Sequence, residues 1–216
     1  MSVAILLTLL VTAIMSAGSI RSTNSVLLDN MQITARIASQ SISSNLHLLT
    51  ERMYHLSSEQ ILTDASNSDS DKAARLMEEK LEIEFVWLSA YDLAGQKLYG
   101  DEIAPASISD TSYYSYLTQT GSIVIGEPYY DNNILQLCVG TPLITDGETV
   151  GYLIGSYKYD LLNDILSMLI LGDTGSASIL NEEGFIIGDR SLENIIDRQN
   201  IYDLYPSSAN KESFDK

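Results

Sequence analysis

The sequence predicts an α+β protein in which one long N-terminal helix carries two antiparallel-sheet modules in tandem, the second of them incomplete. Three features lead to this expectation: an uncharged apolar run at the start, an amphipathic stretch without Pro or Gly behind it, and two copies of a strand-turn-strand pattern further on. With 216 residues and 45% hydrophobic side chains, the chain can bury the cores of one or two domains.

The apolar run at residues 2–20 contains no charged side chain, and about 18 such residues suffice to cross a bilayer core as a helix. We therefore expect residues 1–20 to form a transmembrane helix. A cleaved signal peptide is the alternative, because Ser16 and Gly18 are small enough to flank a cleavage site, although a basic segment in front is missing. The first basic residue is Arg21, so charge does not set the topology, and we expect the true N-terminus to lie upstream of Met1.

The next segment, residues 21–62, is a predicted stalk helix. Its apolar or small side chains recur every three or four residues, which is typical of one helical face. They are Leu27, Met31, Ala35, Ala38, Ile42, Leu46, Leu49, Met53 and Leu56. A helix of about 35 residues at ~1.5 Å per residue is about 50 Å long. The stripe predicts a rod along which the modules pack and through which two chains form a homodimer.

The charge balance excludes several classes of function. The formal net charge is -17, and residues 1–62 carry equal numbers of basic and acidic side chains, so the whole excess lies in residues 63–216. An acidic domain of this kind argues against a nucleic-acid partner. One cysteine and two histidines leave no disulfide framework and no thiolate zinc site. We assign no catalytic residue, metal or cofactor, and expect an acidic domain outside a bacterial membrane.

Residues 63–170 are the predicted membrane-distal module. Strand formers occupy 85–92, 122–125, 134–139 and 149–159, and short turns between them favour antiparallel pairing. A helix is expected at 160–170. Residues 171–216 form the predicted partial membrane-proximal module. Its segment 178–187 matches 89–98 at an offset of 89 residues, which indicates a duplicated unit, although chance similarity between hairpins is the alternative.

Together these segments resemble the double Cache sensor domain of bacterial membrane receptors, in which two PAS-like modules sit on one long helix. The resemblance rests on the anchor and stalk and on four blocks: SDTSYYSYLTQTG (109–121), GEPYY (126–130), ETVGYLIGSYKYDLLNDIL (148–166) and LGDTGSASILNEEG (171–184). It implies the ligand-sensing input region of a methyl-accepting chemotaxis receptor, which binds a small solute and transmits a helix displacement across the membrane. The same domain on a diguanylate cyclase or histidine kinase, or a pilin-like structural subunit, remains an alternative.

The resemblance also implies a ligand site. In the amino-acid-binding branch of the family, an Arg clamps the ligand carboxylate, aromatic residues frame it and an Asp takes the ammonium. By position, the Arg falls on Thr111, the aromatic pair on Tyr113 and Tyr114, a later Tyr on Tyr129, and the Asp on Ser156. Both charged anchors are absent, which argues against ordinary α-amino acids as ligands.

The residues themselves also indicate a small-molecule site. Ten of the thirteen tyrosines lie between 91 and 159, and tyrosine combines an apolar face with a hydroxyl. Residues 85–159 contain eight acidic side chains and only two lysines. The resulting negative potential favours a cationic or neutral polar ligand. The alternative is that these acidic side chains only lie on solvated loops. We add Trp87, either a core residue or a stacking platform, and the acid Asp131 to the candidate ligand-binding residues.

Overall fold

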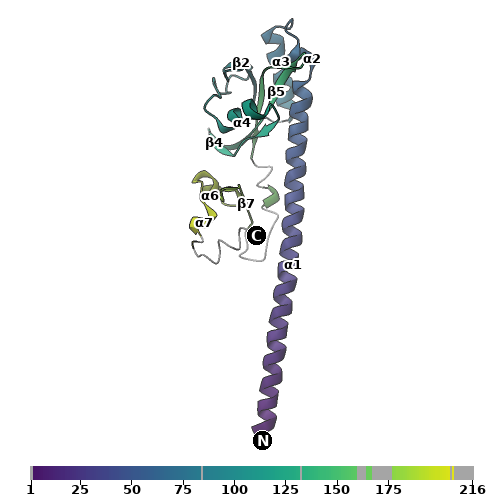
Figure 1. Cartoon of the computed structure of the whole chain (residues 1–216), viewed down its shortest axis with the longest axis vertical. Coiled ribbons are helices and arrows are strands. Elements are labelled where there is room, and N and C mark those ends of the chain that lie inside the picture. Colours follow the sequence, from purple (N-terminus) through teal and green to yellow (C-terminus); the bar gives the residue numbers. More distant parts are fainter. Residues whose placement is uncertain are drawn as a thin grey trace.

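The computed structural model describes residues 2–83, 85–131, 133–159, 164–166, 177–204 and 206, with side chains from residue 25 onward. Helix α1 (Ser2–Ser57) runs past both modules, and the larger module lies beside its C-terminal end (Figure 1). At ~1.5 Å per residue its 56 residues make a rod of about 84 Å. The expected stalk is therefore confirmed as a helix, but it ends at Ser57 rather than at residue 62.

Among the described residues, the first module follows α1 and contains three helices and six strands. The helices are α2 (Gln60–Thr63), α3 (Asp69–Ile83) and α4 (Ser112–Thr120). The strands are β1 (Trp87–Tyr91), β2 (Lys97–Gly100), β3 (Val124–Ile125), β4 (Tyr129–Asp131), β5 (Ile134–Thr145) and β6 (Glu148–Lys158).

These strands form one antiparallel sheet in the order β2-β1-β6-β5-β3, with β4 also paired to β5. Because side chains alternate across a strand, the sheet has two covered faces. One face packs on α1 and α3 through Met53, Leu76 and Leu153. The other face lies under α4 and carries Trp87, Cys138 and Ile154. The predicted α+β architecture with PAS-like antiparallel modules is therefore confirmed.

The second module repeats the hairpin of the first. Strands β7 (Ser178–Leu180) and β8 (Ile186–Asp189) pair antiparallel, followed by α6 (Leu192–Ile196) and α7 (Ile201–Leu204). In both hairpins the turn begins with an acid or amide side chain whose oxygen accepts two backbone N–H groups, Asp92 in the first and Asn181 in the second. Both turns end on a glycine in the left-handed region, Gly95 and Gly184, where a side chain would be strained.

The two hairpins also share the position of an irregularity in strand pairing. The pairing register shifts between Ala90 and Tyr91 in the first and between Ile179 and Leu180 in the second, again 89 residues apart. A chance resemblance between two common hairpins would not reproduce the position of a bulge. The two modules therefore share one structural plan, as the sequence pattern indicates.

Two expectations fall wholly or partly outside the described residues. The side chains of the apolar segment at 1–20 are not among them, and among those that are described no helix is both long and apolar enough to cross a membrane. Of the helix expected at 160–170, only residues 164–166 are described, and they are helical.

Candidate functional site

The candidate residues come together on the face of the sheet that α4 covers. Trp87 on β1 is paired with Ser156 on β6, and Ser156 is paired on its other side with Cys138 on β5. Tyr129 on β4 reaches the same place from the edge of the sheet. Of these residues, the resemblance named Tyr129 and Ser156, which come from two separate strands and are neighbours in space.

A buried hydrogen-bond group joins three of these strands. The Tyr129 hydroxyl donates to Gln136 Oε1 at 3.0 Å and lies 3.2 Å from the Ser156 hydroxyl, which itself donates to Gln136 Oε1 at 2.6 Å. The Cys138 thiol donates to the Tyr129 hydroxyl at 3.5 Å. We call Tyr129, Gln136, Cys138 and Ser156 the polar group. Its members hold neutral hydroxyl, amide and thiol functions, so it offers hydrogen bonds but no partner charge for a carboxylate.

Thr111 serves as a helix cap. Its hydroxyl donates to the carbonyl of Ile108 at 2.7 Å and accepts from the backbone N–H of Tyr114 at 3.4 Å, which satisfies one free donor at the start of α4. The single hydroxyl proton is therefore used within the protein. Thr111 fixes the start of the helix that carries Tyr113 and Tyr114.

The two aromatic residues of α4 differ in their surroundings. Tyr113 is 8% exposed and packs in the core beneath the helix. Tyr114 is less buried, donates its hydroxyl to the carbonyl of Leu93 at 2.8 Å, and meets the ring of Tyr152 edge to face at 5.8 Å. Tyr114 therefore fastens α4 to the turn of the β1–β2 hairpin, while Tyr113 points toward the sheet.

Asp131 and Trp87 have different places in this arrangement. Asp131 is exposed at the end of β4, and its backbone carbonyl accepts a hydrogen bond from Gln136 Nε2 at 3.2 Å. Trp87 is 2% exposed and packs in the same core cluster as Tyr113. In this closed arrangement the protein's own side chains fill the space between α4 and the sheet.

Burial also shifts the acid-base properties of the site. Loss of water raises the pKa of Tyr129 well above its ordinary value, and hydrogen bonds from Ser156 and Trp87 offset only part of the rise. Burial likewise raises the pKa of Tyr113 and raises that of the Cys138 thiol to about 11. The polar group and Tyr113 are therefore uncharged at neutral pH.

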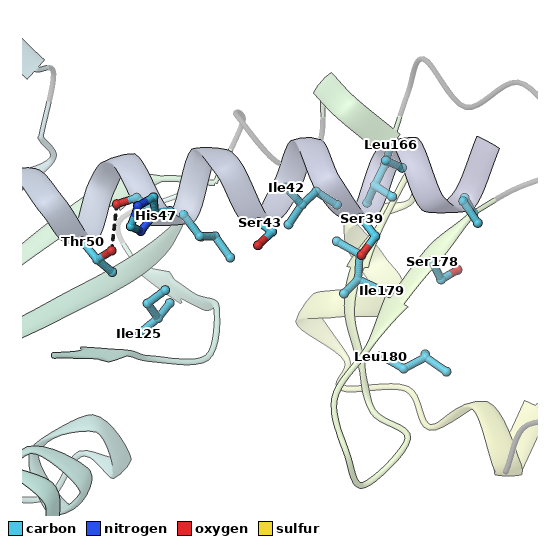
Figure 2. Close-up of a pocket in the computed structure, with 14 residues that line it drawn as sticks. Ser39, Ile42, Ser43, His47, Thr50, Ile125, Leu166, Ser178, Ile179 and Leu180 are labelled. Carbon is cyan, nitrogen blue, oxygen red and sulfur yellow. Dashed lines mark hydrogen bonds between the residues drawn. The ribbon is translucent and has the colours of Figure 1, made fainter. Parts of the chain in front are cut away.

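Open space lies elsewhere, along the stalk. A cavity of about 670 Å³ is bordered by α1 on one side and by β7 on the other (Figure 2). Small side chains on α1, such as Ser39 and Ser43, leave the room, and Ile42 and Ile179 give it an apolar lining. A second cavity of about 650 Å³ lies at the far end of α1, between Tyr54 and Pro142. Neither is lined by any of the candidate ligand-binding residues.

Sequence reasoning missed Gln136, which is 1% exposed and accepts from both hydroxyl groups. A signal was present, because Gln136 is a polar side chain within the otherwise apolar run of β5 and shares a face with Cys138. Cys138 is fully buried, and its thiol also donates to Tyr129.

No protein-family model and no curated protein matches the sequence. Solved structures do. The ligand-binding domain of the Pseudomonas aeruginosa amino acid chemoreceptor PctB, in complex with L-Gln, has a TM-score of 0.69 at 20% identity over 82% of this chain and 74% of that chain. The corresponding domain of PctC from the same organism, in complex with GABA, has a TM-score of 0.64 at 18% identity over 81% of this chain and 80% of that chain. The ligand-binding domain of Mlp24 with asparagine has a TM-score of 0.68 at 18% identity over 85% of this chain and 78% of that chain. The chain has the double Cache fold.

At these identities the double Cache likeness defines the fold and leaves the ligand of this chain open. The polar group occupies the place between α4 and the central strands where the resemblance implied a ligand. The positions that the resemblance assigned to charged side chains hold Thr111 and Ser156 in this chain, so a function has to be argued from these residues themselves.

Proposed function

We propose that this chain is the input domain of a bacterial chemoreceptor and that a small solute binds between α4 and the polar group. One observation carries the proposal: a double Cache fold that holds a buried polar group, Tyr129, Gln136 and Ser156, under a capped helix. Buried polar side chains need partners inside the protein, and the members of this group supply hydrogen-bond partners that a solute could take over. A solute would move Tyr113 aside, lie against its ring and exchange hydrogen bonds with the polar group.

The chemistry of the site favours a cationic or neutral polar solute. None of the four members of the polar group is a cation, so a carboxylate would lose its hydration without gaining a charged partner. Tyrosine faces and hydroxyls can receive an ammonium or an amide. The acidic excess of the surrounding strands and loops attracts cations to the module.

Calorimetric titration of the full chain with primary amines, neutral amides and carboxylates tests the proposal. We expect an amine or amide to bind and Tyr113→Ala to weaken it about tenfold or more, the loss of roughly 1.4 kcal/mol. Tyr116→Ala is the matched control, because Tyr116 lies on the same helix and is 59% exposed. Tight carboxylate binding, or binding that Tyr113→Ala and the milder Tyr129→Phe leave unchanged, would refute the assignment.

Signal transmission is part of the same proposal. The chain is anchored by residues 1–20 in a membrane with its modules outside the cell, and solute binding shifts α1 relative to a partner helix. The first module packs directly on α1 through Met53 and Leu56, which are nearly fully buried. A displacement of the sheet therefore acts on the rod.

A homodimer through α1 completes the proposal. The stripe expected to pair two chains is occupied only in part, since Met53 and Leu56 are buried in the core whereas Leu27 and Met31 are exposed. Another set of apolar side chains on α1 remains exposed at helical spacing: Val26 (57%), Ile33 (56%), Ile37 (61%) and Leu48 (52%). Sedimentation of the full chain should give a dimer that Ile33→Glu and Ile37→Glu dissociate. A monomeric wild-type chain would contradict this part of the proposal.

A further inference from the structure

The link between β3 and β4 is held at both ends by the candidate site. The backbone N–H of Gly126 donates to the carbonyl of Cys138 at 2.8 Å, and a Cβ at Gly126 would lie 3.1 Å from Tyr113 Cδ1. At the other end, Tyr129 enters the polar group. Any rearrangement of Tyr113 or Tyr129 therefore moves residues 126–128.

From this link, Glu127 reaches across to the second module. Its Oε1 accepts a hydrogen bond from Asn181 Nδ2 at 2.8 Å, and its Oε2 forms an ion pair with Arg198 Nη2 at 3.0 Å. One carboxylate thus contacts two points of the second module, the hairpin turn and the second residue after α6.

Both partners of Glu127 are themselves held in place. The amide oxygen of Asn181 accepts from the backbone N–H groups of Glu183 and Phe185, so only its amide nitrogen faces Glu127. The Arg198 guanidinium lies over the Phe185 ring at 5.3 Å from the centroid. Both partners are therefore fixed to the β7–β8 hairpin, so a movement of the Glu127 carboxylate acts on the hairpin as a whole.

Attachment of the second module does not depend on this contact. Leu135, Leu137 and Tyr159 pack against Ile186 and Ile195, and the Tyr159 hydroxyl donates to the carbonyl of Ile187. The side chains of Glu127 and Arg198 are 42% and 59% exposed, and ion pairs this open add little to stability. Two gaps border Glu127 and Pro128 on the side of the second module, one of about 10 Å³ and one of about 210 Å³. Since apolar packing holds the second module in place, the contact serves to link residues 126–128 to the hairpin turn.

We propose that Glu127 is a positioning residue that couples the candidate site to the second module. When the polar group rearranges, residues 126–128 shift, and the carboxylate draws the turn at Asn181 and the Arg198 side chain with it. The proposal rests on the proposed function for what opens the site, but the coupling itself is testable without any ligand.

The test is amide hydrogen exchange on the full chain, with Tyr129→Phe as the perturbation of the site. The reporters are the N–H groups of Ile186 and Ile201, which bond to Gln199 and Gly184 in the second module. We expect Tyr129→Phe to speed exchange at both reporters about threefold, since subglobal opening follows such local changes. In a Glu127→Ala background, where the link to the second module is cut, the same substitution should add nothing. Glu127→Gln, which keeps an oxygen for Asn181, should be intermediate.

Glu148→Ala is the matched control, because Glu148 is an exposed acid at the start of β6. In a Glu148→Ala background, Tyr129→Phe should still speed exchange at both reporters by the full amount. An equal effect of Tyr129→Phe in the Glu127→Ala background, or no effect at the reporters in the wild-type chain, overturns the coupling. Once a solute is found, Glu127→Ala should keep its affinity within about threefold while losing solute-induced protection at the reporters. Failure to find any solute would refute the proposed function, whereas the coupling stands or falls on the ligand-free exchange rates.

Discussion

The hydroxyl oxygens of Tyr129 and Ser156 lie 3.2 Å apart, and both donate to the same amide oxygen of Gln136. Ser156 and Gln136 are almost completely buried, so water cannot replace a lost partner. The three side chains therefore act as one unit beneath α4, and a solute that binds there has to replace some of these hydrogen bonds.

Replacing Gln136 by leucine should destabilise the chain. The substitution removes the shared acceptor of two hydroxyls and leaves them short of a partner, at a cost of about 1–3 kcal/mol in the free energy of unfolding. Urea denaturation measures it. Gln96→Leu is the control, because Gln96 is exposed and should change stability by less than about 0.5 kcal/mol. Equal stability of the two variants would show that the polar group has no energetic weight.

Tyr157 offers the opposite case. Among the described side chains, its hydroxyl is the buried polar atom without a hydrogen-bond partner. Its ring packs on Phe85, with 4.2 Å between the two ring centroids. Tyr157→Phe should therefore leave stability unchanged or raise it by about 1 kcal/mol. Tyr159→Phe, which loses a bond to Ile187, should lower stability by about 1 kcal/mol. A clear loss for Tyr157→Phe would mean that its hydroxyl has a partner.

The single thiol provides a probe of the closed site. Cys138 is fully buried, and burial raises its pKa to about 11, so almost no thiolate exists at neutral pH. An aromatic disulfide reagent should label it only when the chain unfolds or the site opens. Rapid stoichiometric labelling of the native chain at about pH 8 would contradict the closed arrangement.

Buried tyrosines predict a loss of stability in alkali. Burial raises the pKa of Tyr99 from 10.0 to about 12, and it also raises the pKa values of Tyr113, Tyr129 and Tyr157. Between about pH 10 and about pH 12, the unfolded chain releases phenol protons that the folded chain keeps. The resulting stability is fully present below about pH 10 and is lost as pH rises through about 12. Urea unfolding across this range should show the decline, and a flat profile would rule out these shifts.

Local patterns allowed much of the fold to be predicted. The turns at Asp92 and Asn181 follow from a side chain that caps its own turn and a glycine three residues later, so both hairpins were visible in the sequence. The end of α1 was placed too late. The hydroxyls of Ser57 and Ser58 bond back to the carbonyl of Tyr54 and compete with the next helical turn, a signal that the expected apolar stripe concealed.

The candidate site was only partly predictable. Tyr129 and Ser156 came from resemblance, while Gln136 was missed because its partners lie 7 and 20 residues away. The Glu127 contact with Arg198 spans 71 residues, and no periodicity encodes such a pairing. Packing between α4 and the sheet also converted an expected open pocket into a closed core, since nothing in a sequence reports how side chains fill the space between elements.

A crystal structure of the chain with the tightest-binding amine or amide tests the central claim most directly. The account predicts density between α4 and β6 in contact with Tyr113 and Ser156, together with altered hydrogen bonds at Gln136. A solute bound only in the cavity between α1 and β7, above an unchanged polar group, would contradict it.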